Sequence, residues 1–169
     1  IITSAKGVTS GYVPLGVVVV RQKIADFFED KMLWCGLTYS GHPLACAAGL
    51  ATIQVYQEEQ LVENAFELGK YLGEQLEDIK AHYPLVGDVR YIGLFSTIEL
   101  VEDRATKKPL SVSLMQKIGA ELRDRGLFTY TMASNMGAMI FVIPPLVINQ
   151  AQLDEGLGII REVLETVSH

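Results

Sequence analysis

The strongest periodic pattern in the chain lies near its middle and is helical. Leucine, alanine and isoleucine side chains recur every three or four residues from Leu61 to Ile79, which predicts a long amphipathic helix over residues 60–80 with a charged, solvated face. Pro84 ends the pattern, and the composition changes at the same point. We therefore expect this helix to lead from a first domain, residues 1–59, into a second one, residues 60–169.

The residues after Pro84 alternate between strand and helix patterns. Residues 88–100 are predicted to form a strand pair or one long bent strand, with Gly93 permitting a bulge, and residues 102–109 a charged exposed loop. A helix is expected over 113–124, stopped by Gly126, followed by strands over 127–132 and 138–143 that a hairpin turn over 133–137 joins. The last helix follows a capping-box pair, Asn149 and Gln152. These strands and helices make up the second expected domain, residues 60–169.

The first domain carries a continuous apolar run instead of an alternating one. Four consecutive valines predict that residues 11–20 form a buried strand. A short helix is expected over residues 21–30. Pro43 fits the first position of a further helix, with Ser40 or His42 near its cap.

Lys6 occupies an unusual position for a lysine. It lies between two isoleucines and a glycine-punctuated turn, so we expect it at the end of a strand and not on a solvated helix. If the ammonium is partly buried there, desolvation lowers its pKa, and an amine needs a low pKa to attack a carbonyl. The small neighbours Ser4, Ala5 and Gly7 would let a planar ring lie against the backbone. Most lysines are solvated surface residues, so the position alone also allows that simpler interpretation.

The helix predicted to begin at Pro43 offers a second candidate feature. A helix start has free N–H groups and the positive end of the helix dipole, and such ends hold phosphates well. Every helix has such an end, so a plain cap on a buried helix is the simpler interpretation of this pattern alone.

Composition limits the remaining possibilities. The chain has 169 residues, of which 49% are hydrophobic and 20% charged, which is typical of a globular protein. Its formal net charge of −6 argues against a nucleic-acid or anionic-membrane partner. Cys35 and Cys46 are too few for a disulfide framework and lack a metal-ligand set, so we predict no metal site and expect the cytoplasm. The uncharged run over residues 7–20 contains Pro14 and three glycines and is not expected to span a membrane.

Two segments carry a resemblance to a known family. Residues 5–16 read Ala-Lys-Gly-Val-Thr-Ser-Gly-Tyr-Val-Pro-Leu-Gly, and residues 38–48 read Thr-Tyr-Ser-Gly-His-Pro-Leu-Ala-Cys-Ala-Ala. Both are similar to segments of the class III (omega) aminotransferases, pyridoxal 5′-phosphate (PLP) enzymes of fold type I. Later segments, such as residues 86–90, resemble the family's small domain, although Tyr91 stands where a glycine is common.

The resemblance implies an α/β fold made of two parts. Residues 1–59 would be the tail of the large PLP-binding domain, and residues 60–169 the small α+β domain with a mostly antiparallel sheet. Because the chain opens at Ile1, inside a predicted strand, we expect it to be the C-terminal fragment of a longer enzyme. The fragment alone is expected to be inactive, since family members hold their ring-nitrogen aspartate, ring-stacking aromatic and other phosphate loop upstream.

The same resemblance implies roles for particular residues. Lys6 would carry PLP as a Schiff base and move the proton between substrate and cofactor. Thr38 would contact the phosphate of the cofactor held by the partner subunit, which implies a homodimer with a shared active site. Ser40 and Gly41 would add contacts to that phosphate, and Thr9 would line the lysine turn as a further cofactor-binding residue.

Three further residues, His42, Arg90 and Arg125, receive no catalytic role from the resemblance or from the sequence. His42 is interpreted as a helix-entry residue, because the family gives its position no part in proton transfer. Residues 127–132 contain no arginine of the kind that grips a substrate carboxylate in some relatives. Arg90 and Arg125 are the nearest candidates, and we expect either to be a surface or ion-pair residue.

The implied reaction is transfer of an amino group from an amine or amino acid to a 2-oxo acid or aldehyde. Since residues 127–132 lack an arginine, we lean to an amine or omega-amino acid as the donor. Two alternatives remain open. One is another class III reaction, such as that of an aminomutase or decarboxylase, and the other is a noncatalytic α/β interaction module.

Overall fold

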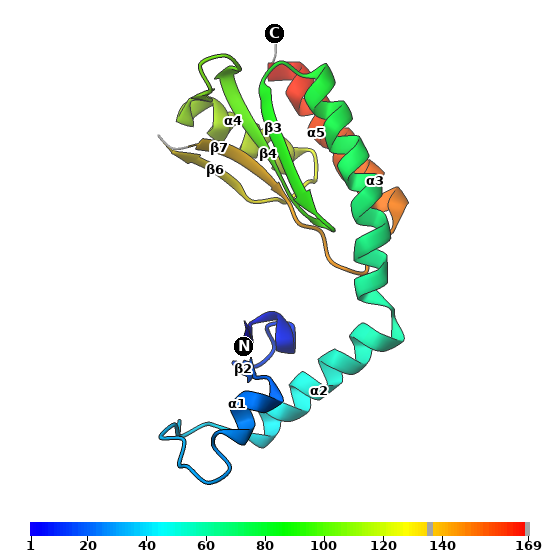
Figure 1. Ribbon diagram of the computed structural model, residues 1–169. Coiled ribbons are helices and arrows are strands. Elements are labelled where there is room, and N and C mark those ends of the chain that lie inside the picture. The colour runs from blue at the N-terminus through cyan, green and yellow to red at the C-terminus, as the bar shows by residue number, and fades with distance from the viewer. Residues whose placement is uncertain (135–136, 168–169) are drawn as a thin grey trace. The chain divides into compact units, whose positions relative to one another are not determined.

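A computed structural model describes residues 1–134 and 137–167 of the chain (Figure 1). Its elements fall into two units, Ile1–Gln60 and Leu61–His169, and each is described by itself.

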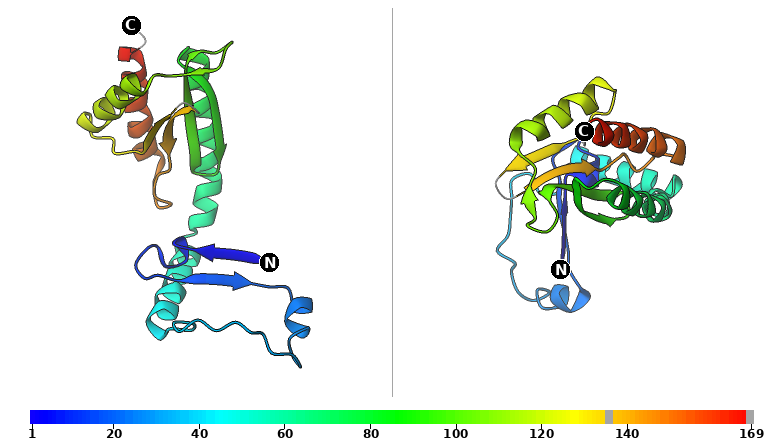
Figure 2. Two further views of the ribbon diagram at one scale, coloured as in Figure 1. Left: turned by 90° about the vertical axis from the view of Figure 1, so that its left-hand side faces the viewer. Right: turned by 90° about the horizontal axis from the view of Figure 1, so that it is seen from above.

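The second unit is built on an antiparallel sheet. Its strands are ordered β3 (Val86–Ile92), β4 (Phe95–Asp103), β7 (Gly137–Val142) and β6 (Thr131–Ser134), with β5 (Lys108–Pro109) paired to β4. The helices are α3 (Leu61–His82), α4 (Val112–Asp124) and α5 (Gln150–Val167). Helices α4 and α5 lie behind the sheet as Figure 1 shows it, and Figure 2 places them on one side of it. The expected small α+β domain with a mostly antiparallel sheet is confirmed.

One core joins the sheet to all three helices. Its largest fully buried side chains are Leu72, Leu76 and Ile79 of α3, Val86 of β3, Ile98 and Leu100 of β4, Met115, Ile118 and Leu122 of α4, Ile140 of β7, and Ile160 and Leu164 of α5. The helical members recur every three or four residues, as the sequence pattern predicted for α3 and α5. Complete burial of a Leu or Ile side chain contributes about 1.5–3 kcal/mol, so this core holds the unit together.

The helix ends agree with the sequence signals. Ser111 caps α4 by accepting a hydrogen bond from Leu114 N–H, and Gly126 follows the helix with φ +94°. Before α5, Asn149 N–H donates to Gln152 Oε1 at 3.1 Å, and Gln152 N–H donates to Asn149 Oδ1 at 3.0 Å. This reciprocal pair confirms the predicted capping box.

The sheet differs from the prediction at three places. Residues 88–100 form a strand pair, and Gly93, with φ +54°, lies in the two-residue turn between β3 and β4 and not in a bulge. The predicted loop over 102–109 contains the short strand β5. Strand β6 is shorter than predicted: its ladder pairs Thr131 with Ile140 and ends at Ser134 with Gly137. Residues 127–130 lie outside this ladder, although Phe141 N–H donates to Tyr130 O at 2.9 Å. Asn135 and Met136 of the predicted hairpin turn lie outside the described residues.

The first unit contains a two-stranded ribbon and two α-helices. Strand β1 (Ile2–Ala5) pairs antiparallel with β2 (Gly16–Val19), and the short 3₁₀ helix η1 (Gly7–Thr9) lies between them in sequence (Figure 2). The helices are α1 (Gln22–Asp26) and α2 (Pro43–Glu58). Helix α1 is shorter than predicted: it has five residues and none is buried, and so short a helix gains little without packing.

The expectation of a buried strand over residues 11–20 is wrong for this chain. Only Gly16–Val19 is a strand, and its side chains are largely exposed, with Val18 at 65% and Val19 at 54%. A continuous β-branched run is typical of a strand covered on both faces. Such a cover is not formed by the described residues around β2.

Candidate active site

Lys6 begins the turn between β1 and η1 and has a strained backbone. It follows Ala5, the last residue of β1, so the lysine lies at a strand end as predicted. Its dihedral angles are φ 56° and ψ −81°, close to those of the rarer γ-turn, which L-residues seldom adopt. Such conformations cost on the order of 1–3 kcal/mol and cluster at functional sites.

Hydrogen bonds within the turn hold this conformation. The carbonyl oxygen of Lys6 accepts from the N–H groups of Thr9 and Gly11, both at 3.2 Å. The Thr9 hydroxyl, which is completely buried, donates to the carbonyl oxygen of Val13 at 2.5 Å. Ser10 and Gly11 both have positive φ, at 51° and 79°, and reverse the chain between these bonds.

Helix α2 supports the lysine turn from outside. The turn packs against the helix where Gly49 is buried. A Cβ atom at Gly49 would lie 3.1 Å from Leu15 Cδ2 and 3.8 Å from the Val8 carbonyl oxygen. The absence of a side chain at this position therefore lets the turn approach the helix closely.

The side chain of Lys6 is exposed in this chain, contrary to the expectation of a partly buried ammonium. The physical reason is the same as for β2. The described residues pack against the backbone of the lysine turn, and none of them covers the Lys6 side chain. The burial expected around the Lys6 amine is therefore not provided by the described residues.

The second candidate segment is the turn before α2. Ser40 N–H donates to Leu37 O at 3.0 Å and His42 N–H to Tyr39 O at 3.2 Å, while Gly41 has φ +68°. Thr38, Ser40 and Gly41 are exposed. Within residues 1–134 and 137–167, no hydrogen bond is formed by the hydroxyl groups of Thr38 or Ser40, so both can meet a ligand.

Helix α2 begins at Pro43, as the sequence predicts, and His42 is the capping residue. The His42 side chain makes no capping hydrogen bond, and its ring lies 5.6 Å from that of Tyr39. By helix geometry the N–H groups of Leu44 and Ala45 have no partner inside the helix. The turn and helix start together present hydroxyl and N–H donors, which is the chemistry that binds a phosphate dianion.

The structure thus forms two separate turns. Lys6 and Thr9 share the first, and Thr38, Ser40 and Gly41 share the second. No hydrogen bond joins them among the described atoms. The donor set fits a phosphorylated aldehyde, because a free amine can bond the aldehyde carbon and the second turn can bind the phosphate.

Both arginines considered as carboxylate ligands are ion-pair residues, which confirms that prediction. Arg90 donates to Glu99 at 2.6 Å and to Asp88 at 3.1 Å, and the hydrogen bond that it donates to Glu99 is the main reason that the pKa of Arg90 is raised. Arg125 lies 3.0 Å from Glu162.

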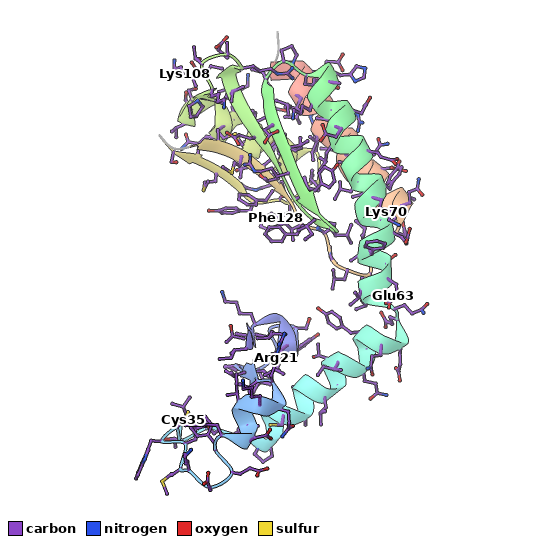
Figure 3. The ribbon with its side chains drawn as sticks, in the orientation of Figure 1. Arg21, Cys35, Glu63, Lys70, Lys108 and Phe128 are labelled. Atoms are coloured by element: carbon purple, nitrogen blue, oxygen red, sulfur yellow. The ribbon has the colours of Figure 1, made fainter. Side chains whose placement is uncertain are left out.

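Other kinds of site find no support among residues 1–134 and 137–167. Cys35 lies on the connection between α1 and α2 (Figure 3), and both it and Cys46 are exposed and free. No group of three or more His, Cys, Asp or Glu side chains is arranged to hold a metal ion. None of the described helices has the length and apolar character needed to cross a bilayer.

Two features of the site were not found from the sequence. The strained backbone of Lys6 has only an indirect signal, the glycines at positions 7 and 11 that permit a tight turn. The bond from Thr9 to Val13 has none, because a threonine hydroxyl can reach many carbonyl groups and the sequence does not specify which.

Comparison with known proteins decides the family. The family model for class III aminotransferases matches residues 1–164. The chain belongs to the class III aminotransferase family. It corresponds to the C-terminal part of these proteins.

Several class III aminotransferases are similar over nearly the whole chain. The putrescine–pyruvate aminotransferase of Pseudomonas aeruginosa is 34% identical over 163 residues, covering 95% of this chain and 35% of that protein. The 5-aminovalerate aminotransferase of the same organism is 36% identical, covering 98% and 38%. The crystal structure of taurine:2-oxoglutarate aminotransferase from Bifidobacterium kashiwanohense, in complex with PLP and glutamate, is 42% identical with a TM-score of 0.85, covering 98% and 37%. The chain therefore spans little more than a third of these relatives' length.

Proposed function

We propose that the full-length protein is a PLP-dependent aminotransferase in which Lys6 binds the cofactor covalently. The supporting observation is that the family match covers the segment in which a free amine stands on a strained turn at a strand end. When bound, PLP supplies the electron sink that makes a carbon–hydrogen bond beside the substrate nitrogen acidic.

Lys6 supplies two functions in this proposal. Its Nζ atom would hold the cofactor through the aldehyde carbon, with the aldehyde oxygen leaving as water, and would be released when an amine donor takes its place. The freed amine would then accept the proton from the donor carbon that carries nitrogen and return it to the neighbouring cofactor carbon. One side chain can do both because, as the turn is built, only its flexible stem moves while the backbone is held by the Thr9 and Gly11 N–H groups.

The second turn would bind the cofactor phosphate. The Thr38 hydroxyl would donate to a phosphate oxygen of the cofactor held by the partner subunit, with Ser40 and the Gly41 N–H as further donors. The N-terminus of α2 adds the positive end of its dipole. This arrangement requires a homodimer, which we propose as the active form in the cytoplasm.

The exposed surface of α2 supports burial of the first unit in a larger assembly. Leu44, Leu50 and Ile53 are 64%, 69% and 48% exposed, although the helix is apolar on most of its circumference. A helix of this kind is typical of a protein interior. We therefore propose that the isolated 169-residue chain neither binds PLP tightly nor turns over.

For the donor we propose a terminal primary amine or omega-amino acid. The names of the relatives above specify taurine, putrescine and 5-aminovalerate, which all carry an amine at a chain end. Arg90 forms an ion pair with Glu99, and Arg125 forms one with Glu162. Neither arginine therefore provides a free positive charge to bind the alpha-carboxylate of a substrate.

The experiment is amino transfer by the full-length protein from a terminal amine to pyruvate or 2-oxoglutarate, compared with transfer from alanine. We expect faster transfer from the terminal amine and none by the Lys6→Ala variant. Exclusive use of alpha-amino acids would refute the donor assignment. Release of carbon dioxide or isomerisation without consumption of a 2-oxo acid would indicate a decarboxylase or an aminomutase, and equal behaviour of Lys6→Ala would indicate a noncatalytic module.

A further inference from the structure

We propose that Thr9 is a positioning residue for Lys6: its buried hydroxyl closes the turn that sets the direction of the lysine side chain. The inference rests on the proposed function and deepens it. It also differs from the cofactor-lining role that the family resemblance implies for Thr9.

The burial of Thr9 separates the two roles. Thr9 and Ser96 are the buried polar side chains of the described part of the chain, and Thr9 has no exposed surface at all. A side chain without exposed surface offers nothing for a cofactor to touch. The hydroxyl proton is also committed, because it is donated to Val13 O at 2.5 Å. Thr9 therefore acts through another residue.

The hydrogen-bond geometry points to Lys6 as that residue. The N–H of Thr9 donates to the Lys6 carbonyl at 3.2 Å, and its hydroxyl oxygen lies 3.5 Å from the same carbonyl oxygen. One residue thus joins the beginning of the turn, at Lys6, to its end, at Val13. The positive φ of Lys6 persists only while the surrounding turn enforces it.

Loss of the hydroxyl would release this constraint. Without the bond to Val13, the turn can open and let Lys6 relax to ordinary extended angles, which swings its Cα–Cβ bond. The contact with α2 at Gly49 would remain, because Leu15 and Val8 make it through atoms that Thr9 does not contribute. The turn would then keep its place while the lysine lost its direction.

The variants that test this are Thr9→Val, Thr9→Ser and Thr52→Val in the full-length holoenzyme. Thr9→Val keeps the shape and removes the hydroxyl, while Thr9→Ser keeps the hydroxyl. Thr52 is a matched control in the same unit, since its hydroxyl donates to Ala48 O at 2.9 Å inside α2. For each variant we would measure kcat, KM, the pH at which the absorbance band of the lysine-bound cofactor changes, and the rate at which PLP reattaches to the cofactor-free protein.

We expect Thr9→Val to lower kcat by about 10- to 100-fold with KM little changed, since a misplacement of about 1 Å costs this much. The pH at which its cofactor absorbance band changes should shift, and PLP should reattach more slowly to the cofactor-free protein. Thr9→Ser should restore all of these values, and Thr52→Val should match the unmodified protein. Should Thr9→Val fail to fold, Thr9→Ala is measured in its place against the same expectations.

The inference is overturned if Thr9→Val matches the unmodified protein, or if Thr9→Ser is as impaired as Thr9→Val. Its failure remains distinct from failure of the proposed function. In the former case borohydride still fixes PLP to Lys6 of the unmodified protein, and in the latter it does not.

Discussion

Gly69 tests how closely α3 must approach the turn between β3 and β4. A Cβ atom at this position would lie 2.4 Å from the Cα, 2.6 Å from the carbonyl carbon and 2.8 Å from the carbonyl oxygen of Gly93. All three are backbone atoms and cannot turn aside as a side chain would. Gly93 itself has φ +54°, and a Cβ atom there would lie 3.2 Å from the carbonyl oxygen of Ala65, one turn earlier in α3, so the helix and the turn approach closely at this second position too.

The net effect of Gly69→Ala follows from two opposed terms. Replacing glycine by alanine inside a helix stabilises the helix by about 1 kcal/mol. Overpacking typically costs about 1–3 kcal/mol, and contact with unyielding backbone belongs at the upper end of that range. We therefore expect Gly69→Ala to lower the free energy of unfolding by about 1–2 kcal/mol.

Gly158→Ala provides the matched control. Gly158 lies within α5, and a Cβ atom there would meet no heavy atom within 4 Å. Only the helix-propensity term acts, so this variant should be more stable by about 0.5–1 kcal/mol. Denaturant unfolding of the 169-residue chain and the two variants measures both changes. A Gly69→Ala variant as stable as Gly158→Ala would refute the close approach of α3 to Gly93.

Two further predictions concern hydrogen bonds of the second unit. A hydrogen bond from Lys80 at 2.8 Å is the main reason that the pKa of Asp88 is lowered. The ionised Asp88 therefore stabilises the fold above its unfolded pKa of about 3.9, and this stabilisation is lost as the pH falls through the lower folded value. Because the pair is partly exposed, Asp88→Asn should cost less than about 1 kcal/mol at neutral pH and nothing in strong acid, and a loss that grew towards acid pH in unfolding titrations would contradict this sign. Arg104 donates to the carbonyl groups of Lys80 and Val86 at 2.5 and 2.9 Å, so Arg104→Ala should cost about 1–3 kcal/mol in denaturant unfolding, and no measurable loss would mean that water replaces the guanidinium at the end of α3.

The sequence predicted helices better than strands in this chain, for a physical reason. The buried stripe of α3 and the capping pair before α5 are local patterns, complete within a few turns of chain. Strand pairing is less local, because β4 and β7 lie far apart in the chain and still pair, for example Ser96 with Val142. The approach of Gly69 to Gly93 is equally non-local, and neither glycine alone indicates it.

The same distinction between local and non-local features applies to the candidate site. The position of Lys6 at a strand end and of Pro43 at a helix start followed from local sequence. Exposure could not be predicted in the same way, because the valine run of β2 indicates burial by atoms that the described chain does not contain. The angles of Lys6 depend on several hydrogen bonds made at once by Thr9 and Gly11, and no pattern of residue types encodes that combination.

The most direct test of the account is chemical fixation of the cofactor in the full-length protein. Sodium borohydride reduces the bond between a lysine and PLP to a stable amine, which peptide digestion and mass spectrometry then assign to one residue. The account predicts that the added mass lies on Lys6 and is absent after Lys6→Ala. Fixation on another lysine, or no fixation after reconstitution with PLP, would contradict it.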